Sequence, residues 1–474
     1  MKNRIGIFIS LSLIIFLGSS CASIRSPIEI PVTVPKEFSI SGEETLPDQW
    51  WNSFNDPVLS GLIEKALSEN FSLRSSWNRL SQAEAIARKA GADLFPSLET
   101  QAGVSRTWSE GRTGTTGSSG SNPFNDFSLG LAASYELDLW GRIRSSREAA
   151  QMDLQASREN LNSAAISLSA QVARVWYQLV EQIAQLNLLR RQLETNEQVL
   201  ELVTLRFRRG QVGATDVLQQ RQLVELRRSE IISAETRLKL QEHQLAILLG
   251  KAPEVKVADR RAEWVELPPL PSTGVPLDWI RKRPDIREAH FAVLSADHRV
   301  GSALADRFPR FSLSVQGSTS GDQIRDLFDN WPATIAANLV APLIDGGDRR
   351  AEVERTRAVL SQTLNDYAQV ILESLGEVED SLTQELKQRE LIESLSKQFN
   401  LSLQVIQRVR DNYTHGGVDY LRVLDALLTH QLLERTLLEE RRRLFEFRIN
   451  LCRAIGGGWE LNPTVSVSER GRES

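Results

Sequence analysis

The chain is poor in the residues that build disulfide frameworks and metal sites. Its 474 residues contain only two cysteines and five histidines. Two cysteines exclude a scaffold held by several disulfides, and the scattered histidines lack the spacing of metal ligands. The net charge of −5 gives no sign of a basic surface for nucleic acid. No nucleophile elbow or phosphate loop stands out, so we predict no metal site, no cofactor and no enzyme.

One apolar run near the N-terminus has the length and flanks of an export signal. Lys2 and Arg4 precede it, and the run 5–17 holds 13 residues, too few to span a bilayer. Cys21 follows a glycine and two serines, which resembles a bacterial lipobox, whose cysteine becomes an acylated N-terminus. We therefore predict a signal peptide over 1–20 and a covalent lipid on Cys21. Ordinary signal cleavage without acylation is the alternative.

The rest of the chain carries an internal repeat marked by glycines. Gly141 and Gly210 are 69 residues apart, and so are Gly347 and Gly416. Equal spacings between glycines in two halves of one chain indicate a duplicated module. Each module would contain a long helix, a glycine turn and a shorter helix.

Apolar residues recur every seven positions between these glycines, which is the pattern of helices packed side by side. A run of about 65 residues at 1.5 Å each spans roughly 100 Å, so the pattern predicts a long rod or tube. Gln182 interrupts the first series, and the second module is looser. The two series before Gly210 are Leu154, Leu161, Leu168, Val175 and Leu189, and Val172, Leu179, Leu186, Leu193 and Leu200.

Each module also contains a stretch in which apolar and polar residues alternate. The cleanest is 127–139, whose odd positions are aromatic or aliphatic and whose even positions are small or polar. Alternation predicts strands with one apolar face, here two β-hairpins over 97–140 and 310–344. Strands of about ten residues suit a tilted crossing of an outer membrane.

Four strands cannot close a barrel, and an open sheet edge is not tolerated in lipid. Closure therefore requires several copies of the chain. Three copies would supply twelve strands, an even number within the range known for such barrels. The sequence thus predicts a mainly α chain with a transmembrane β-barrel portion: a homotrimer with a twelve-stranded barrel and a helical tunnel.

This reading divides the chain into six segments. In order they are a signal peptide, a lipidated tether with an equatorial segment, a first repeat, a linker, a second repeat and an equatorial tail. Their predicted bounds are 1–20, 21–56, 57–250, 251–275, 276–456 and 457–474.

Several short motifs, in this order and spacing, carry a resemblance to a known family. The chain resembles TolC-type outer-membrane efflux proteins, of the lipoprotein subfamily that includes OprM and NodT. The resemblance covers nearly all of the mature chain. Its motifs are Trp51–Pro57, Glu136–Arg142, Arg283–Arg287, Asp345–Gly347, Val418–Ala426 and Gly456–Trp459.

The resemblance implies a location in the outer membrane of a Gram-negative bacterium, with a lipid anchor and a tunnel that extends into the periplasm. It implies a homotrimeric channel that receives substrates from an inner-membrane pump, of the RND type, through a periplasmic adaptor protein. The channel would close at its periplasmic tip, where the glycine turns lie. Outer-membrane lipid is the further expected partner, and nucleic acid is not.

Asp425 matches an acidic position that lies near the constriction in that family. By threefold symmetry it would form a ring of carboxylates that biases the aperture. Arg422, Asp419 and Tyr413 are further gate candidates, and Arg422 lies on the same helix face as Asp425. The alternative is that all four are ordinary solvated residues at a helix turn.

The tips also supply candidates for contact with the adaptor, because glycine permits close approach of another backbone. These are Gly210, Val212, Gly416 and Val418. Plain turn geometry explains the glycines equally well.

Two other functions remain open at this point. A conduit for secretion of protein or oligosaccharide would use the same tube. A structural coiled-coil lipoprotein of the envelope would explain the heptads but not the hairpins at matching places in both modules. The transported substrate stays open, although a chain whose only methionines are Met1 and Met152 disfavours a methionine-lined path for copper or silver.

Overall fold

The structure is a computed structural model that describes residues 32–108, 124–253 and 264–456. The compact unit described below begins at Val34. The predicted signal peptide, Cys21 and the tail 457–474 lie outside the described residues.

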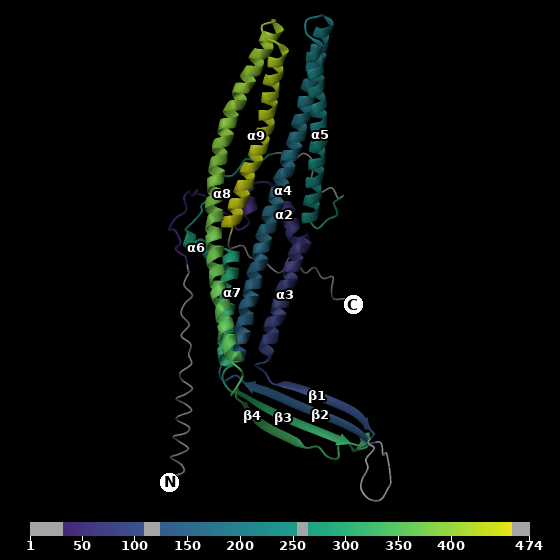
Figure 1. The fold of residues 1–474 in the computed structure, drawn as a ribbon, viewed down its shortest axis with the longest axis vertical. Helices are drawn as coiled ribbons and strands as arrows, with labels where there is room; N and C mark the ends of the chain where they lie inside the picture. Colours follow the sequence, from purple (N-terminus) through teal and green to yellow (C-terminus); the bar gives the residue numbers. More distant parts are fainter. Residues whose placement is uncertain (1–31, 109–123, 254–263, 457–474) are drawn as a thin grey trace. The chain divides into compact units, whose positions relative to one another are not determined.

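Long helices and one four-stranded sheet make up this unit (Figure 1). The first module contains η1 (Trp50–Phe54), α2 (Pro57–Glu69), α3 (Phe71–Ala92), β1 (Ser97–Thr107), β2 (Phe124–Leu137), α4 (Arg142–Arg208) and α5 (Ala214–Leu248). The second contains α6 (Pro276–Ile280), α7 (Pro284–Ala305), β3 (Arg310–Gly321), η2 (Ile324–Asp326), β4 (Ala333–Val340), α8 (Asp348–Thr414) and α9 (Tyr420–Ile455).

The duplication predicted from the glycines is visible in the helices. α4 and α8 each contain 67 residues, and each ends at a glycine turn that leads into a shorter antiparallel helix. Figure 1 shows the α4–α5 and α8–α9 pairs running in the same direction, away from the sheet. The alternation likewise predicted the strands, although they end at Leu137 and Val340 rather than at 140 and 344.

Carboxylates fix the points at which the chain enters its helices. Asp56 accepts hydrogen bonds of 3.0 Å from the backbone N–H groups of Val58 and Leu59, which caps α2. Asp138 accepts from the backbone N–H groups of Ile143 and Arg144 at 3.0 and 2.9 Å. Because Gly141 begins α4 without a side chain of its own, Asp138 supplies the cap from the end of β2.

The sheet is antiparallel throughout, in the order β1-β2-β3-β4. Its register aligns apolar residues across all four strands, as in the row Leu98, Ala133, Val315 and Ile335. The next row on the opposite face is Ser97, Ser134, Ser314 and Ala336. One face of the sheet is therefore apolar and the other polar.

That apolar face is uncovered in the single chain. Leu98, Val104 and Ile335 are 72, 75 and 80% exposed. A soluble monomer rarely exposes an apolar surface of this extent, so the face is suited to lipid.

The main core lies where the short segments cross the long helices, a region here called the equator. Trp50, Trp51 and Phe54 are at most 1% exposed and pack with residues of α4, α5 and α9. Arg448 of α9 pairs with Glu385 of α8 at 2.5 Å, and both are buried. The same guanidinium donates to the carbonyls of Pro268 and Pro269, which fastens the linker to the helices.

Between the equator and the tips the helical core becomes polar. Gln192, Asn196 and Arg227 are at most 3% exposed and lie among α4, α5 and α9. The Gln431 Oε1 atom accepts from Arg227 at 3.0 Å. Leu193 and Leu200, predicted as heptad core positions, are only half-buried here, because polar side chains hold the centre of this segment.

Candidate functional site at the helical tips

Each tip is a turn that requires a left-handed backbone conformation. Gly210 has φ +69° and Gly416 has φ +76°, and an added Cβ would meet no atom within 4 Å at either position. The glycines are thus required by backbone conformation and not by crowding. This supports the turn-geometry alternative and leaves their contact with an adaptor a prediction.

The two tips of one chain pack together around a small core. Its buried members are Val203, Val217, Tyr413, Tyr420 and Val423, which come from both helical hairpins, α4–α5 and α8–α9. Val212 and Val418, predicted as adaptor contacts, are half-buried and pack against this cluster. Their side chains therefore have a structural role within the chain.

Arg206, at the end of α4, holds the second tip. Its guanidinium lies 4.4 Å from the centre of the Tyr413 ring and donates to the Tyr413 carbonyl at 3.2 Å and the Thr414 carbonyl at 3.3 Å. These two carbonyls lie at the C-terminal end of α8, where the helix dipole favours a cation. The Tyr413 hydroxyl is buried and has no hydrogen-bond partner among the residues that the structure describes.

A second contact joins the hairpins one turn further in. The Tyr420 hydroxyl of α9 donates to Gln220 of α5, whose amide group in turn donates to the Asn196 carbonyl of α4 at 2.7 Å. Burial, and then the neighbouring Tyr413 and Asp216, raise the pKa of the Tyr420 phenol, so it stays protonated and remains a donor. We call the Arg206–Tyr413 and Gln220–Tyr420 contacts the tip latch.

The structure brings three of the predicted gate residues together on α9. Asp419 caps the helix by accepting from the Arg422 backbone N–H at 3.2 Å, and with Arg422 and Asp425 it lines one cavity of about 470 Å³. All three are exposed, whereas Tyr413 is only 7% exposed. Among the described residues no ion pair joins Arg422 to Asp425, so the carboxylate of Asp425 is available to a ring.

The two tips carry opposite charges, a difference that our sequence analysis did not predict. Each residue of the first tip has its counterpart 206 positions later, so Gly210 matches Gly416 and Gln219 matches Asp425. Over 205–219 there are three arginines and one aspartate, and over 411–425 three aspartates and one arginine. This difference could have been found by aligning the two modules.

Glu136 and Asp138 connect the sheet to the helices. Glu136 pairs with Arg142 at 2.9 Å, and Asp138 caps α4. The Trp140 indole N–H donates to the Pro309 carbonyl at 2.8 Å, and the ring stacks on Phe308 with 4.8 Å between the ring centres. It therefore packs at the join between the two modules.

Other sequence features are structural. Cys452 is 1% exposed, and burial raises the pKa of its thiol to about 12, so it is an unreactive core residue. None of the described helices is both long enough and apolar enough to cross a membrane. Within the described ranges no group of three or more potential metal ligands occurs.

Comparison with known proteins identifies the architecture. The outer membrane efflux protein family matches residues 62–251 and 277–457, which is most of the chain. The chain belongs to this family. A relative, the pyoverdine export outer membrane protein OpmQ of Pseudomonas aeruginosa, is 30% identical over 97% of this chain and 98% of its own length.

Two further comparisons agree. The probable outer membrane lipoprotein SilC of Salmonella typhimurium is 29% identical over 94% of this chain and 97% of its own. A crystal structure of CusC, described in terms of transmembrane channel formation, matches 92% of this chain and 100% of that chain with a TM-score of 0.79 and 27% identity.

Family membership confirms the main predictions. The chain is an outer-membrane efflux channel of a tripartite system, with a periplasmic adaptor and an inner-membrane pump as partners. The helical tunnel, the barrel portion and the trimer are confirmed with it. The roles of individual residues at the tips, and the lipid on Cys21, stay predictions.

Proposed function

We propose that the chain is a passive conduit whose aperture is set at the helical tips, and that it performs no catalysis itself. Three copies would form a ring in which the second tip of each chain, carrying Asp425, surrounds the narrowest point. The adaptor would engage the same tips. The observation that carries the proposal is that the sheet and the helical layer each have two unpaired sides, and that one side of each can pair with the other side in the next copy.

The sheet supplies the first pair of open flanks. β1 and β4 are its free edges, and unpaired edge N–H and C=O groups are not tolerated in lipid. Pairing β4 of one copy with β1 of the next satisfies both edges, and repeating the contact closes a ring.

The helices supply the second pair. α5 and α8 lie at opposite margins of the helical layer (Figure 1), and each exposes an apolar stripe. On α5 the stripe consists of Leu218, Leu226, Ile232, Leu240 and Ile247, which are 45–65% exposed. On α8 it consists of Leu372, Leu386, Leu401 and Val405, which are 43–60% exposed. Steps of six to eight residues on α5, and of fourteen, fifteen and four residues on α8, keep each set on one helix face, so α5 of one copy fits α8 of the next.

The tip latch supports a closed resting state. Because Arg206 and Gln220 of the first hairpin hold Tyr413 and Tyr420 of the second, the α8–α9 tip cannot swing outward without breaking these contacts. A ring of Asp425 carboxylates that binds a cation at the axis would draw the three second tips together and so add to closure. An adaptor that binds the first tip would release the second.

Cargo choice would reside elsewhere in the assembly. OpmQ is named for pyoverdine export, and its likeness to this chain at 30% identity makes pyoverdine export a candidate. The polar face of the sheet carries small residues such as Ser97, Ser134 and Ser314, which offer little to hold one particular substrate. We therefore propose that an RND-type pump selects the substrate.

The mass of the purified protein in detergent tests the ring directly. We expect a complex of three chains that crosslinks no further. Charged replacement of the α5 stripe, Ile232→Asp, should yield monomers, whereas Ile231→Asp on the half-buried side should disturb the chain itself. A stable wild-type monomer would exclude the ring, and a trimer without ion conductance would favour the structural-lipoprotein alternative.

A further inference from the structure

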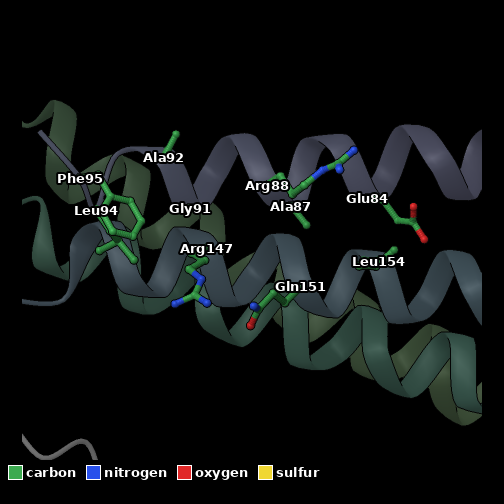
Figure 2. Close-up of a pocket in the computed structure, with 10 residues that line it drawn as sticks. All are labelled: Glu84, Ala87, Arg88, Gly91, Ala92, Leu94, Phe95, Arg147, Gln151 and Leu154. Atoms are coloured by element: carbon green, nitrogen blue, oxygen red, sulfur yellow. The ribbon is translucent and has the colours of Figure 1, made fainter. Parts of the chain in front are cut away.

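A groove between α3 and α4 lies beside the start of the sheet and has no role in the tunnel described above. Its volume is about 550 Å³, and its wall is mainly alanine, leucine and phenylalanine (Figure 2). Two arginines, Arg88 of α3 and Arg147 of α4, line it. The only acid in the lining is Glu84, at the end of the groove opposite Phe95.

The two arginines have no acidic partner within the described chain. Both are exposed, and neither takes part in an ion pair or a side-chain hydrogen bond among the described residues. Gly91 leaves open the space beside Arg147, because an added Cβ there would lie 3.7 Å from the Arg147 Nε atom. The groove thus combines an apolar floor with two available cations.

The second module shows that the scaffold does not require these features. Before the strands the two modules align with an offset of 213 residues, as Ala92-Asp93 and Phe95-Pro96 match Ala305-Asp306 and Phe308-Pro309, and Arg88 therefore corresponds to Gly301. After the strands the offset is 206, so Arg147 corresponds to Val353, which is 4% exposed. Phe308, the counterpart of Phe95, stacks on Trp140, whereas Phe95 is 72% exposed. The second module thus has neither arginine at the matching positions, and its Phe308 is 41% exposed, less than Phe95.

The position of the groove defines what it can meet. Phe95 precedes β1 by two residues, and the apolar face of the sheet begins at Leu98. If the strands cross the hydrocarbon layer, the groove lies at its periplasmic border, where lipid phosphates replace acyl chains. The polar cavity on the other side of α3 and α4, which includes Asp153, Arg299 and Glu352, faces away from it.

We infer that this groove binds an anionic phospholipid of the periplasmic leaflet. One acyl chain would lie along Leu94 and Phe95, at the end of the groove next to the sheet, and the phosphate would bind Arg88 and Arg147 further along it (Figure 2). An arginine fits a phosphate with two parallel N–H donors, and its stem packs on apolar surface. The inference rests on the proposed channel function, because it needs the sheet to span the membrane.

Native mass spectrometry of the detergent-purified trimer, titrated with phosphatidylglycerol, tests the site. We expect one tightly retained lipid per chain in the wild type. The double variant Arg88→Ala/Arg147→Ala should weaken its apparent affinity about thirtyfold, since each cation near an anionic headgroup contributes about a factor of five. Arg158→Ala is the matched control, because Arg158 is exposed on the same helix and outside the groove, and it should bind as the wild type does.

A second variant separates the acyl chain from the phosphate. Gly91→Leu fills the groove but keeps both arginines, so it should also lose the lipid, and inorganic phosphate at millimolar concentration should not displace it. Unchanged binding in either groove variant, displacement by inorganic phosphate, or a wild-type trimer that retains no lipid would overturn the inference. Conductance of the same trimer keeps this failure distinct: a trimer that conducts but retains no lipid refutes only the site, whereas one that does not conduct refutes the channel.

Discussion

The equator and the tips are built from the same helices but are stabilised differently. At the equator Trp50, Trp51 and Phe54 are fully buried in a large core, and a buried ion pair fastens the linker. The tip core has five buried residues, and between the two regions the helix interior is polar. A conduit that opens at one end needs a rigid equator and a tip that moves at a low cost in free energy. The distribution of buried apolar residues provides both.

The largest effect should come from the equator. Among the described residues, Arg448→Leu leaves Glu385, 2% exposed, with the exposed Arg389 as its one remaining ion-pair partner, and it removes the bonds to two proline carbonyls. We expect a loss of about 3 kcal/mol in folding stability, since breaking a buried pair costs about 3–5 kcal/mol. The thermal midpoint of the helical circular dichroism signal measures it.

Arg389→Leu is the matched control, because it removes a 48% exposed partner from the same carboxylate. It should cost less than about 1 kcal/mol. Equal losses in the two variants would show that the buried pair does not fasten the equator.

At the tip, Arg206→Ala removes two charge-assisted hydrogen bonds and a cation–π contact. Because Arg206 is half-exposed, we expect the closed tip to lose about 2 kcal/mol of stability, while the equator stays folded. Hydrogen exchange of the backbone N–H groups over 411–420 should accelerate about thirtyfold. Asn412→Ala, at the counterpart position in the second module, should leave it unchanged, and protection that survives in Arg206→Ala would remove the latch.

The two glycine turns should respond alike. Gly210→Ala and Gly416→Ala force a Cβ into positive φ without any clash, so each should cost about 1 kcal/mol locally. Exchange rates on either side of each turn report the change. A large effect at Gly416 alone would mean that its tip is constrained by more than turn geometry.

The smallest expected effect is a pH dependence of folding stability that arises at the equator and not at the tip. Burial alone would raise the pKa of Glu377, but Arg283 and Arg453 together hold it below its ordinary value of 4.5. A lowered pKa in the folded state stabilises the fold above the unfolded value, and this contribution is lost as pH falls below about 4.5.

The thermal midpoint should therefore drop between pH 6 and pH 3.5, and by less in Glu377→Gln than in the wild type. An equal drop in both proteins would place the acid sensitivity in other carboxylates.

Local signals in the sequence predicted most of the fold. The equal glycine spacings predicted the two modules, and the alternation of apolar and polar residues predicted the β-hairpins. Asp56 before Pro57 is a local signal of the same kind, since it caps α2. These features work because capping, turn geometry and strand faces depend on neighbouring residues.

The latch could not be predicted in this way. Arg206 and Tyr413 are 207 residues apart, and neither lies in a pattern that names the other as its partner. Gln192 lies outside both heptad series, so the pattern gave no sign that this polar residue is buried. Asp425 was selected by resemblance, and the structure adds that it is exposed beside Asp419 and Arg422.

Single-channel conductance in a planar bilayer tests the central claim most directly, for the wild type and Asp425→Ala, with Gln219→Ala at the counterpart position of the first tip as the control. We expect a small conductance for the wild type, a larger one for Asp425→Ala and no change for Gln219→Ala. A wild type that is already wide open, and that Asp425→Ala leaves unchanged, would contradict an aperture set by the second tip.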